Sequence, residues 1–110
     1  MMFENPERKT HQELLKIFSS GDANEICDAL VAMAFYDEDW KWCQEQCLFL
    51  LEHFDKNISG LAAICLGHIA RIHGQLDKEL VESVLSNHLN NKEISGRIED
   101  ALGDIKMFLG

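Results

Sequence analysis

Cysteine and histidine side chains are the groups in this 110-residue chain that could bind a metal ion or do redox chemistry. Cys43 and Cys47 are four residues apart, so a helix would place both thiols on one face, where Cys65 or His53 could join them in a metal site. Each cysteine nevertheless has apolar neighbours in a helical pattern, and a cysteine in that setting behaves as a small hydrophobic residue. We therefore expect the cysteines to be structural. A thiol- or zinc-dependent regulator that uses Cys43 and Cys47 is the alternative.

No motif in the sequence indicates an active site. No two histidines have the His-x-x-x-His or His-Glu-x-x-His spacing of a metal site, and no serine lies in a nucleophile-elbow motif. The glycines do not cluster in a phosphate-binding loop. Glu99 and Asp100 are adjacent, so their carboxylates would diverge by about 100° on a helix and would not converge on one substrate. We predict a protein that is not an enzyme and that uses no cofactor or metal.

Acidic residues are the strongest chemical signal in the chain. The net charge is −9, and residues 22–55 carry −8 of it, with nine acidic residues and one lysine, Lys41. A field of this sign repels nucleic acid and anionic membranes and attracts basic proteins. We expect a basic protein partner and no binding to nucleic acid or to a membrane. The alternative is a solvated acidic surface that only keeps the protein soluble.

The sequence also carries no signal for secretion or membrane insertion. No apolar run approaches the roughly 18–20 residues that span a bilayer. Residues 1–7 lack the basic and apolar regions of a signal peptide. We expect a cytoplasmic protein whose cysteines are reduced.

A repeated segment organises the elements that must position these residues. Residues 58–70 read ISGLAAICLGHIA, and 36 residues later the chain reads ISGRIEDALGDIK at 94–106. A period of this length, combined with helical apolar spacing, is typical of stacked helical hairpins. We predict one all-α domain over residues 1–110, made of three stacked antiparallel helical hairpins at about 5–36, 39–73 and 77–109.

Capping residues and apolar spacing give the expected helices within these hairpins. The expected N-caps are Asn5 (with Pro6 as the first helical residue), Asp22 (in a capping box with Glu25), Asn57 and Asp77. Gly74 is expected just past the end of the fourth helix. The third helix is expected from about Asp39 to Phe54, with a core stripe of Trp40, Cys43, Cys47, Leu50, Leu51 and Phe54. Gly60 and Gly67 recur at Gly96 and Gly103, which we interpret as close approach between helices.

Two stretches of the chain resemble a known family. Asp39-Trp-Lys-Trp-Cys-Gln44, followed by Gly60-Leu-Ala-Ala-Ile-Cys-Leu-Gly-His-Ile-Ala-Arg-Ile-His-Gly74, is similar to HEAT-type repeat proteins. More narrowly, it resembles small bacterial immunity proteins of contact-dependent growth inhibition (CDI) systems, over about residues 37–109. The resemblance implies a HEAT-like α-solenoid that binds and neutralises the toxic C-terminal domain of a cognate secreted effector, often a nuclease. It does not identify the toxin.

The outward positions of the second helix of each hairpin are the expected binding surface, because such helices usually line one broad face of the stack. Trp42 lies off the core stripe beside the acidic turn at residues 37–39, and aromatic residues dominate interface energies. The alternatives are burial of Trp42 against a neighbouring hairpin and an exposed His68 without a role. The predicted partner-binding residues are Asp22, Glu25, Asp28, Asp37, Glu38, Asp39, Trp42, Ile64, His68, Asp100 and Asp104.

These features together predict an immunity protein. We expect a monomer that forms a 1:1 complex with a basic, nuclease-type toxin domain and occludes the functional surface of that domain. The alternative is a general HEAT-type scaffold or adaptor with a non-toxin partner. Gene context separates the two, because an immunity gene lies directly beside a large toxin gene.

Overall fold

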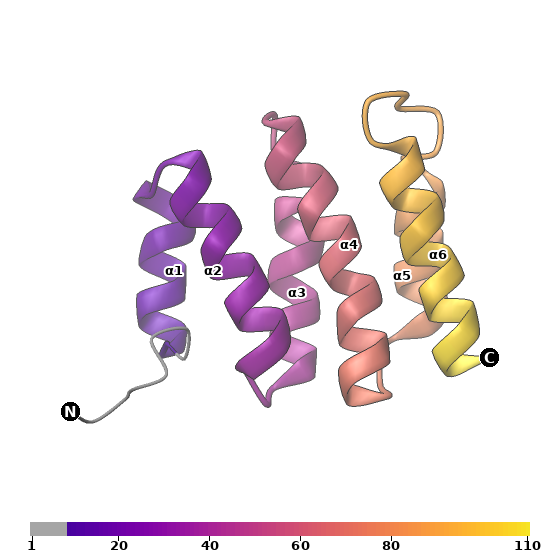
Figure 1. Cartoon of the computed structure of the whole chain (residues 1–110), viewed down its shortest axis with the longest axis horizontal. Helices are drawn as coiled ribbons and strands as arrows, with labels where there is room; N and C mark the ends of the chain where they lie inside the picture. Colours follow the sequence, from indigo (N-terminus) through magenta and orange to yellow (C-terminus); the bar gives the residue numbers. More distant parts are fainter. Residues whose placement is uncertain (1–8) are drawn as a thin grey trace.

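The computed structural model describes residues 9–110, and in that part of the chain it contains six α-helices and no β-strand (Figure 1). Consecutive helices run in opposite directions and are joined by short turns, apart from the longer loop at residues 87–94 between α5 and α6 (Figure 1). The predicted all-α class is confirmed. The helices are α1 (His11–Ser20), α2 (Ala23–Tyr36), α3 (Trp40–Leu50), α4 (Lys56–His73), α5 (Lys78–Ser86) and α6 (Ser95–Leu109).

The even-numbered helices form one layer of the molecule. Helix α4 packs between α2 and α6, and its contacts with α6 are the most extensive between any two helices (Figure 1). Helices α1, α3 and α5 pack on α2, on α4 and on α6 respectively, and α3 and α5 lie behind the first layer in Figure 1. The described chain is elongated, at 46 × 29 × 20 Å. The outward side of α2, α4 and α6 is therefore one continuous face, which we call the α2/α4/α6 face.

Three of the four cysteines lie in the core, as predicted. Cys43, Cys47 and Cys65 are fully buried, while Cys27 is only half-buried. The Sγ atoms of Cys43 and Cys65 each lie 3.8 Å from a carbonyl oxygen of α2. Burial raises the pKa of Cys43 to about 12, so its thiol stays protonated at neutral pH. These side chains act as packing groups with weak hydrogen bonds.

The repeated motif fixes α4 against both α3 and α6. The hydroxyl of Ser59 is buried and donates to the carbonyl of Leu51 at 2.6 Å, just past the end of α3. A Cβ atom on Gly67 would lie 2.9 Å from Asp104 Oδ2 and 3.4 Å from the Cα atom of Ala101, so α6 approaches α4 closely here. At Gly60 the neighbour is the long side chain of Arg97 and not the backbone of α6. The prediction of close approach between helices is confirmed at Gly67.

The second copy of the motif has a different role. Gly96 and Gly103 have open space where a Cβ atom would stand. Within residues 9–110, α6 packs against α4 and α5, and neither helix reaches the space beside these two glycines. The interpretation that these two glycines mark close helix contacts is wrong.

Several helix ends follow the sequence prediction. Asp22 and Glu25 form the predicted capping box of α2. Asp39 caps α3 through Trp42 N, at 3.1 Å. Gly74 follows α4 with φ 64°, a left-handed conformation that glycine adopts without steric cost.

Other helix ends differ from the prediction. The expected cap Asn5 and the expected first residue Pro6 lie outside the described residues, and within them α1 begins at His11 after Thr10, which forms a capping box with Glu13. Asp55, not Asn57, caps α4, because its carboxylate accepts from Asn57 N at 2.8 Å. One side chain of the core stripe expected in the third helix, Phe54, is exposed.

The error at Phe54 has a structural cause. Helix α3 ends at Leu50, and the chain turns at residues 51–54 instead of continuing the helical stripe. Phe54 therefore points away from the core and is 86% exposed.

No helix among residues 9–110 is both long enough and apolar enough to cross a membrane.

Candidate functional site

The acidic residues at and beside the two ends of α2 form two separate groups and not one patch. Asp22 and Glu25 lie at the N-terminus, where Asp22 Oδ1 accepts from Glu25 N at 2.8 Å and Glu25 Oε1 accepts from Asp22 N at 2.9 Å. Residues 37–39 follow the C-terminus, one 14-residue helix away, which corresponds to about 20 Å. A partner would have to be large to contact both groups at once.

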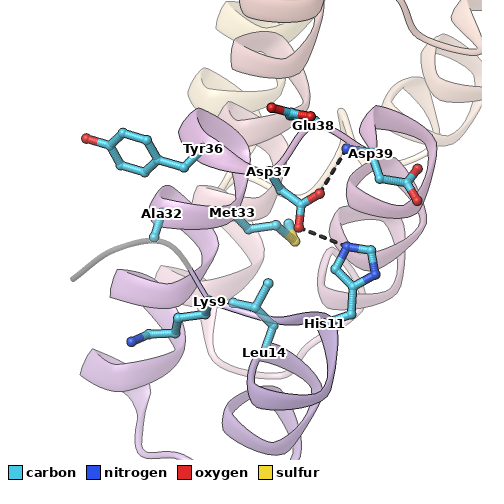
Figure 2. A pocket seen from close by; sticks show the side chains of 9 residues that line it. All are labelled: Lys9, His11, Leu14, Ala32, Met33, Tyr36, Asp37, Glu38 and Asp39. Carbon is cyan, nitrogen blue, oxygen red and sulfur yellow. Dashed lines mark hydrogen bonds and ion pairs between the residues drawn. The ribbon is translucent and has the colours of Figure 1, made fainter. Parts of the chain in front are cut away.

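A pocket of about 270 Å³ lies where α2 turns into α3 (Figure 2). Asp37 points into it, and its Oδ2 atom lies 2.9 Å from His11 Nε2 (Figure 2). Its Oδ1 atom accepts from Asp39 N at 2.9 Å, and the side chain is only 11% exposed. Asp37 thus joins α1 to the α2–α3 turn. The pocket is lined by Lys9, His11, Leu14, Ala32, Met33, Tyr36, Asp37, Glu38 and Asp39.

Glu38 and Asp39 are more exposed than Asp37. Figure 2 shows the carboxylate of Asp39 directed away from the pocket. One oxygen of that carboxylate caps α3, and the remaining acceptor capacity faces outward. Of the three acidic residues in this turn, Glu38 and Asp39 are the ones that a partner would reach.

The ring of Trp42 is occupied by a neighbouring helix. The imidazole of His11 stacks on it with 3.6 Å between ring centroids and 3° between ring planes. Trp42 also packs against the core and is half-buried. This contact with α1 favours the structural alternative for Trp42, because one face of the ring is covered before any partner binds.

Side chains from α2, α4 and α6 meet in a row on the α2/α4/α6 face. Phe35 of α2 lies beside His68 of α4, with 5.1 Å between ring centroids. His68 Nδ1 lies 3.2 Å from Arg71 Nη2, and Arg71 can only donate, so we assign Nδ1 as the acceptor. Asp104 of α6 lies against Gly67 on the other side of α4.

His68 is held neutral in this row. Burial of its ring lowers its pKa, the positive charge of Arg71 lowers it further, and the carboxylate of Asp104 opposes the shift. At neutral pH the ring is therefore uncharged. The uncharged ring of His68 contacts the ring of Phe35 and the guanidinium of Arg71.

The remaining predicted residues lie on the same face with different exposure. Asp28 and Asp100 are exposed, Ile64 and Asp104 are half-buried, and Ala32 is buried. A hollow of about 560 Å³ lies beside this row and is lined entirely by α2. Its lining residues are Asp28, Val31, Ala32, Phe35 and Tyr36.

Sequence reasoning missed Phe35 and Arg71. Phe35 is 40% exposed, and the guanidinium carbon of Arg71 lies 5.8 Å from its ring centroid, within the range of a cation–π contact. The apolar stripe of α2 runs through residues 26, 29, 30 and 33, so Asp28, Val31 and Phe35 share an outward stripe at spacings of three and four. That spacing was the available signal for Phe35.

Among residues 9–110, no three His, Cys, Asp or Glu side chains are grouped so that they could hold a metal ion. Cys47 forms a hydrogen bond with Cys65, and this contact together with burial raises the pKa of Cys47 well above its usual range. A protonated, buried thiol is a poor nucleophile and a poor ligand.

No family model and no curated protein matches the chain. A solved structure does match it, namely a chain in the crystal structure of a CDI complex from Cupriavidus taiwanensis LMG 19424. The two are 29% identical and superpose with a TM-score of 0.84, over 98% of this chain and 97% of that chain. This chain has the fold of a CDI-complex component. The likeness spans nearly the full length of both proteins, so they share the whole helical fold and not only a fragment.

Proposed function

We propose that this chain is an immunity protein of a CDI system. It binds the toxic C-terminal domain of a cognate effector and occludes the functional surface of that domain. The observation that carries the proposal is the full-length likeness, at 29% identity and a TM-score of 0.84, to a chain of a CDI complex. The resemblance of residues 37–109 to CDI immunity proteins supports the same assignment.

The proposed architecture is a stack of three HEAT-type helical hairpins, in which α1–α2, α3–α4 and α5–α6 are the repeats. One ion pair and one histidine–carboxylate hydrogen bond support it. Lys41 Nζ lies 3.1 Å from Asp77 Oδ2, and His88 Nε2 lies 2.7 Å from Glu52 Oε2. Each pair joins residues 36 positions apart, which is the sequence period. Contacts between equivalent positions of successive units are what a stack of repeats produces.

The proposed mechanism is stoichiometric and non-catalytic. With a net charge of −9, the chain attracts a basic toxin domain and speeds its association. A nuclease has a cationic cleft for phosphate, and an acidic face can occupy that cleft without chemistry. The complex is 1:1 and forms in the cytoplasm, and the chain needs no cofactor.

Capture of the toxin domain tests this proposal. The chain is co-expressed with the C-terminal domain of the protein encoded by the neighbouring gene, purified at moderate salt, and sized by light scattering. We expect a 1:1 complex that survives gel filtration. Recovery of the chain without that domain would contradict immunity and would favour a HEAT-type scaffold with another partner.

A further inference from the structure

We propose that the hollow on α2 receives a single lysine or arginine side chain of the partner. This inference rests on the proposed function, because the partner is taken to be the basic toxin domain. The hollow has about 560 Å³ of volume, and its walls are one carboxylate, two aromatic rings and two aliphatic side chains. Asp28 and Phe35 stand seven residues apart, so the hollow extends over two helical turns, about 10 Å along α2.

The carboxylate of Asp28 is available to a partner. Asp28 is exposed, and it forms no ion pair or hydrogen bond within residues 9–110. Glu25, one turn earlier, is by contrast engaged in the capping box, and Asp37, at the far end of the helix, is engaged by His11. Among the described carboxylates along α2, Asp28 is therefore the one with neither oxygen engaged by a hydrogen bond or an ion pair within residues 9–110.

The aromatic rings supply the second half of the recognition. Phe35 and Tyr36 are 40% and 41% exposed, and their ring centroids are 6.5 Å apart. Phe35 already lies within cation–π distance of the guanidinium of Arg71. The described structure thus contains one instance of the contact that we propose for the partner.

A long basic side chain fits this arrangement better than an apolar one. Its charged head pairs with Asp28 or with a ring face, while its methylene stem packs on Val31 and Ala32. A purely apolar group would remove water from Asp28 without replacing its hydrogen bonds, which is unfavourable. Since the chain carries −9 and the partner is basic, charge complementarity also favours a cation.

Two substitutions test the hollow, and each has a matched control on α3, in the other layer. Asp28→Asn removes the charge and keeps the shape, with Glu45→Gln as its control. Phe35→Ala removes the ring, with Phe49→Ala as its control, since Phe49 is also exposed, at 73%. Phe35→Leu keeps apolar bulk but removes the π face. These five variants alter four exposed side chains, and we expect each variant to keep the helical circular dichroism of the wild type.

The measurement is the affinity of each full-length variant for the purified C-terminal toxin domain, by calorimetry at low and at moderate salt. We expect Asp28→Asn, Phe35→Ala and Phe35→Leu each to weaken binding by at least about tenfold, and both controls to stay within about twofold. Asp28→Asn also lowers the dependence of affinity on salt.

The outcomes separate this inference from the function on which it rests. Wild-type binding with unchanged affinity in the Asp28 and Phe35 variants would overturn the hollow as the docking point and leave immunity standing. Absence of wild-type binding would overturn immunity itself. As a further check, Asp28→Lys should abolish binding, and one Lys→Glu or Arg→Glu change in the toxin domain should restore it. Failure of every such reversal to restore binding would contradict recognition of a single basic side chain.

Discussion

The buried hydroxyl of Ser59 provides a direct test of how the repeated motif holds the fold. Ser59 Oγ donates to Leu51 O at 2.6 Å, and both residues are 1% exposed. Leu51 is the C-cap of α3, where carbonyl groups have no partner inside the helix. Ser59→Ala removes the donor and leaves a buried acceptor unsatisfied. We therefore expect it to lower the free energy of unfolding by about 1–3 kcal/mol.

Ser95 is the matched control, because it occupies the same place in the motif 36 residues later. It is only half-buried, and its side chain forms no hydrogen bond within residues 9–110. Ser95→Ala should change the free energy of unfolding by no more than about 0.5 kcal/mol.

The assay is urea unfolding followed by far-UV circular dichroism, with the thermal midpoint as a second readout. For a chain of this size, each kcal/mol lowers the thermal midpoint by about 4 °C. Equal losses in Ser59→Ala and Ser95→Ala would refute the reasoning, because the two sites would then not differ in burial or bonding as described.

Three further predictions concern packing and pH. Gly67→Leu should destabilise the fold by about 1–3 kcal/mol, because α6 leaves no room for a side chain there. Gly103→Ala should stabilise the fold by about 0.5–1 kcal/mol, because the new methyl group enters open space and alanine favours the helix. The urea midpoints of both variants check these two predictions. The hydrogen bond from Gln44, together with that from Lys41, lowers the pKa of Asp77 in the folded protein. The stability that Asp77 contributes is therefore complete above its unfolded pKa of about 3.9 and is lost as pH falls through its folded pKa. Gln44→Leu should flatten that acid limb in urea titrations, and an unchanged limb would contradict the assignment. Burial lowers the pKa of His68, so the stability that its neutral ring contributes is present above about pH 6.5 and is lost as pH falls through the folded pKa. NMR titration of the ring should give a pKa below about 6.5. A normal or raised pKa would be inconsistent with the packing of the ring on Phe35.

Local signals in the sequence predicted much of the fold. The capping box at Asp22 and Glu25 was predictable because both partners lie within one turn of the chain. The burial of Cys43, Cys47 and Cys65 followed from helical apolar spacing. The helical class followed from the same spacing and from the 36-residue period.

Contacts between distant residues accounted for the errors. Helix α3 ends at Leu50, and Ser59 bonds to Leu51 across the following turn, so continuing the apolar stripe to Phe54 placed an exposed ring in the core. The stack of His11 on Trp42 joins residues 31 positions apart and has no local sequence signal. Gly96 and Gly103 face open space because, within residues 9–110, neither α4 nor α5 packs on their side of α6, which the repeat pattern alone does not show.

The candidate site was predictable in composition but not in geometry. The sequence identified the acidic residues, and the structure divides them among helix caps, a hydrogen bond between Asp37 and His11, and exposed carboxylates such as Asp28. Charge counts cannot make this division, because it depends on which hydrogen bonds each carboxylate already makes. Phe35 and Arg71 meet across two helices, so only the packed structure brings them together.

Growth of cells that produce the neighbouring gene's C-terminal domain is the most direct test of immunity. That domain is induced alone, with this chain, and with an unrelated acidic helical protein of similar size. The account predicts that growth stops with the domain alone and with the unrelated protein, and is restored by this chain. Equal arrest of growth with and without this chain would contradict the proposed function.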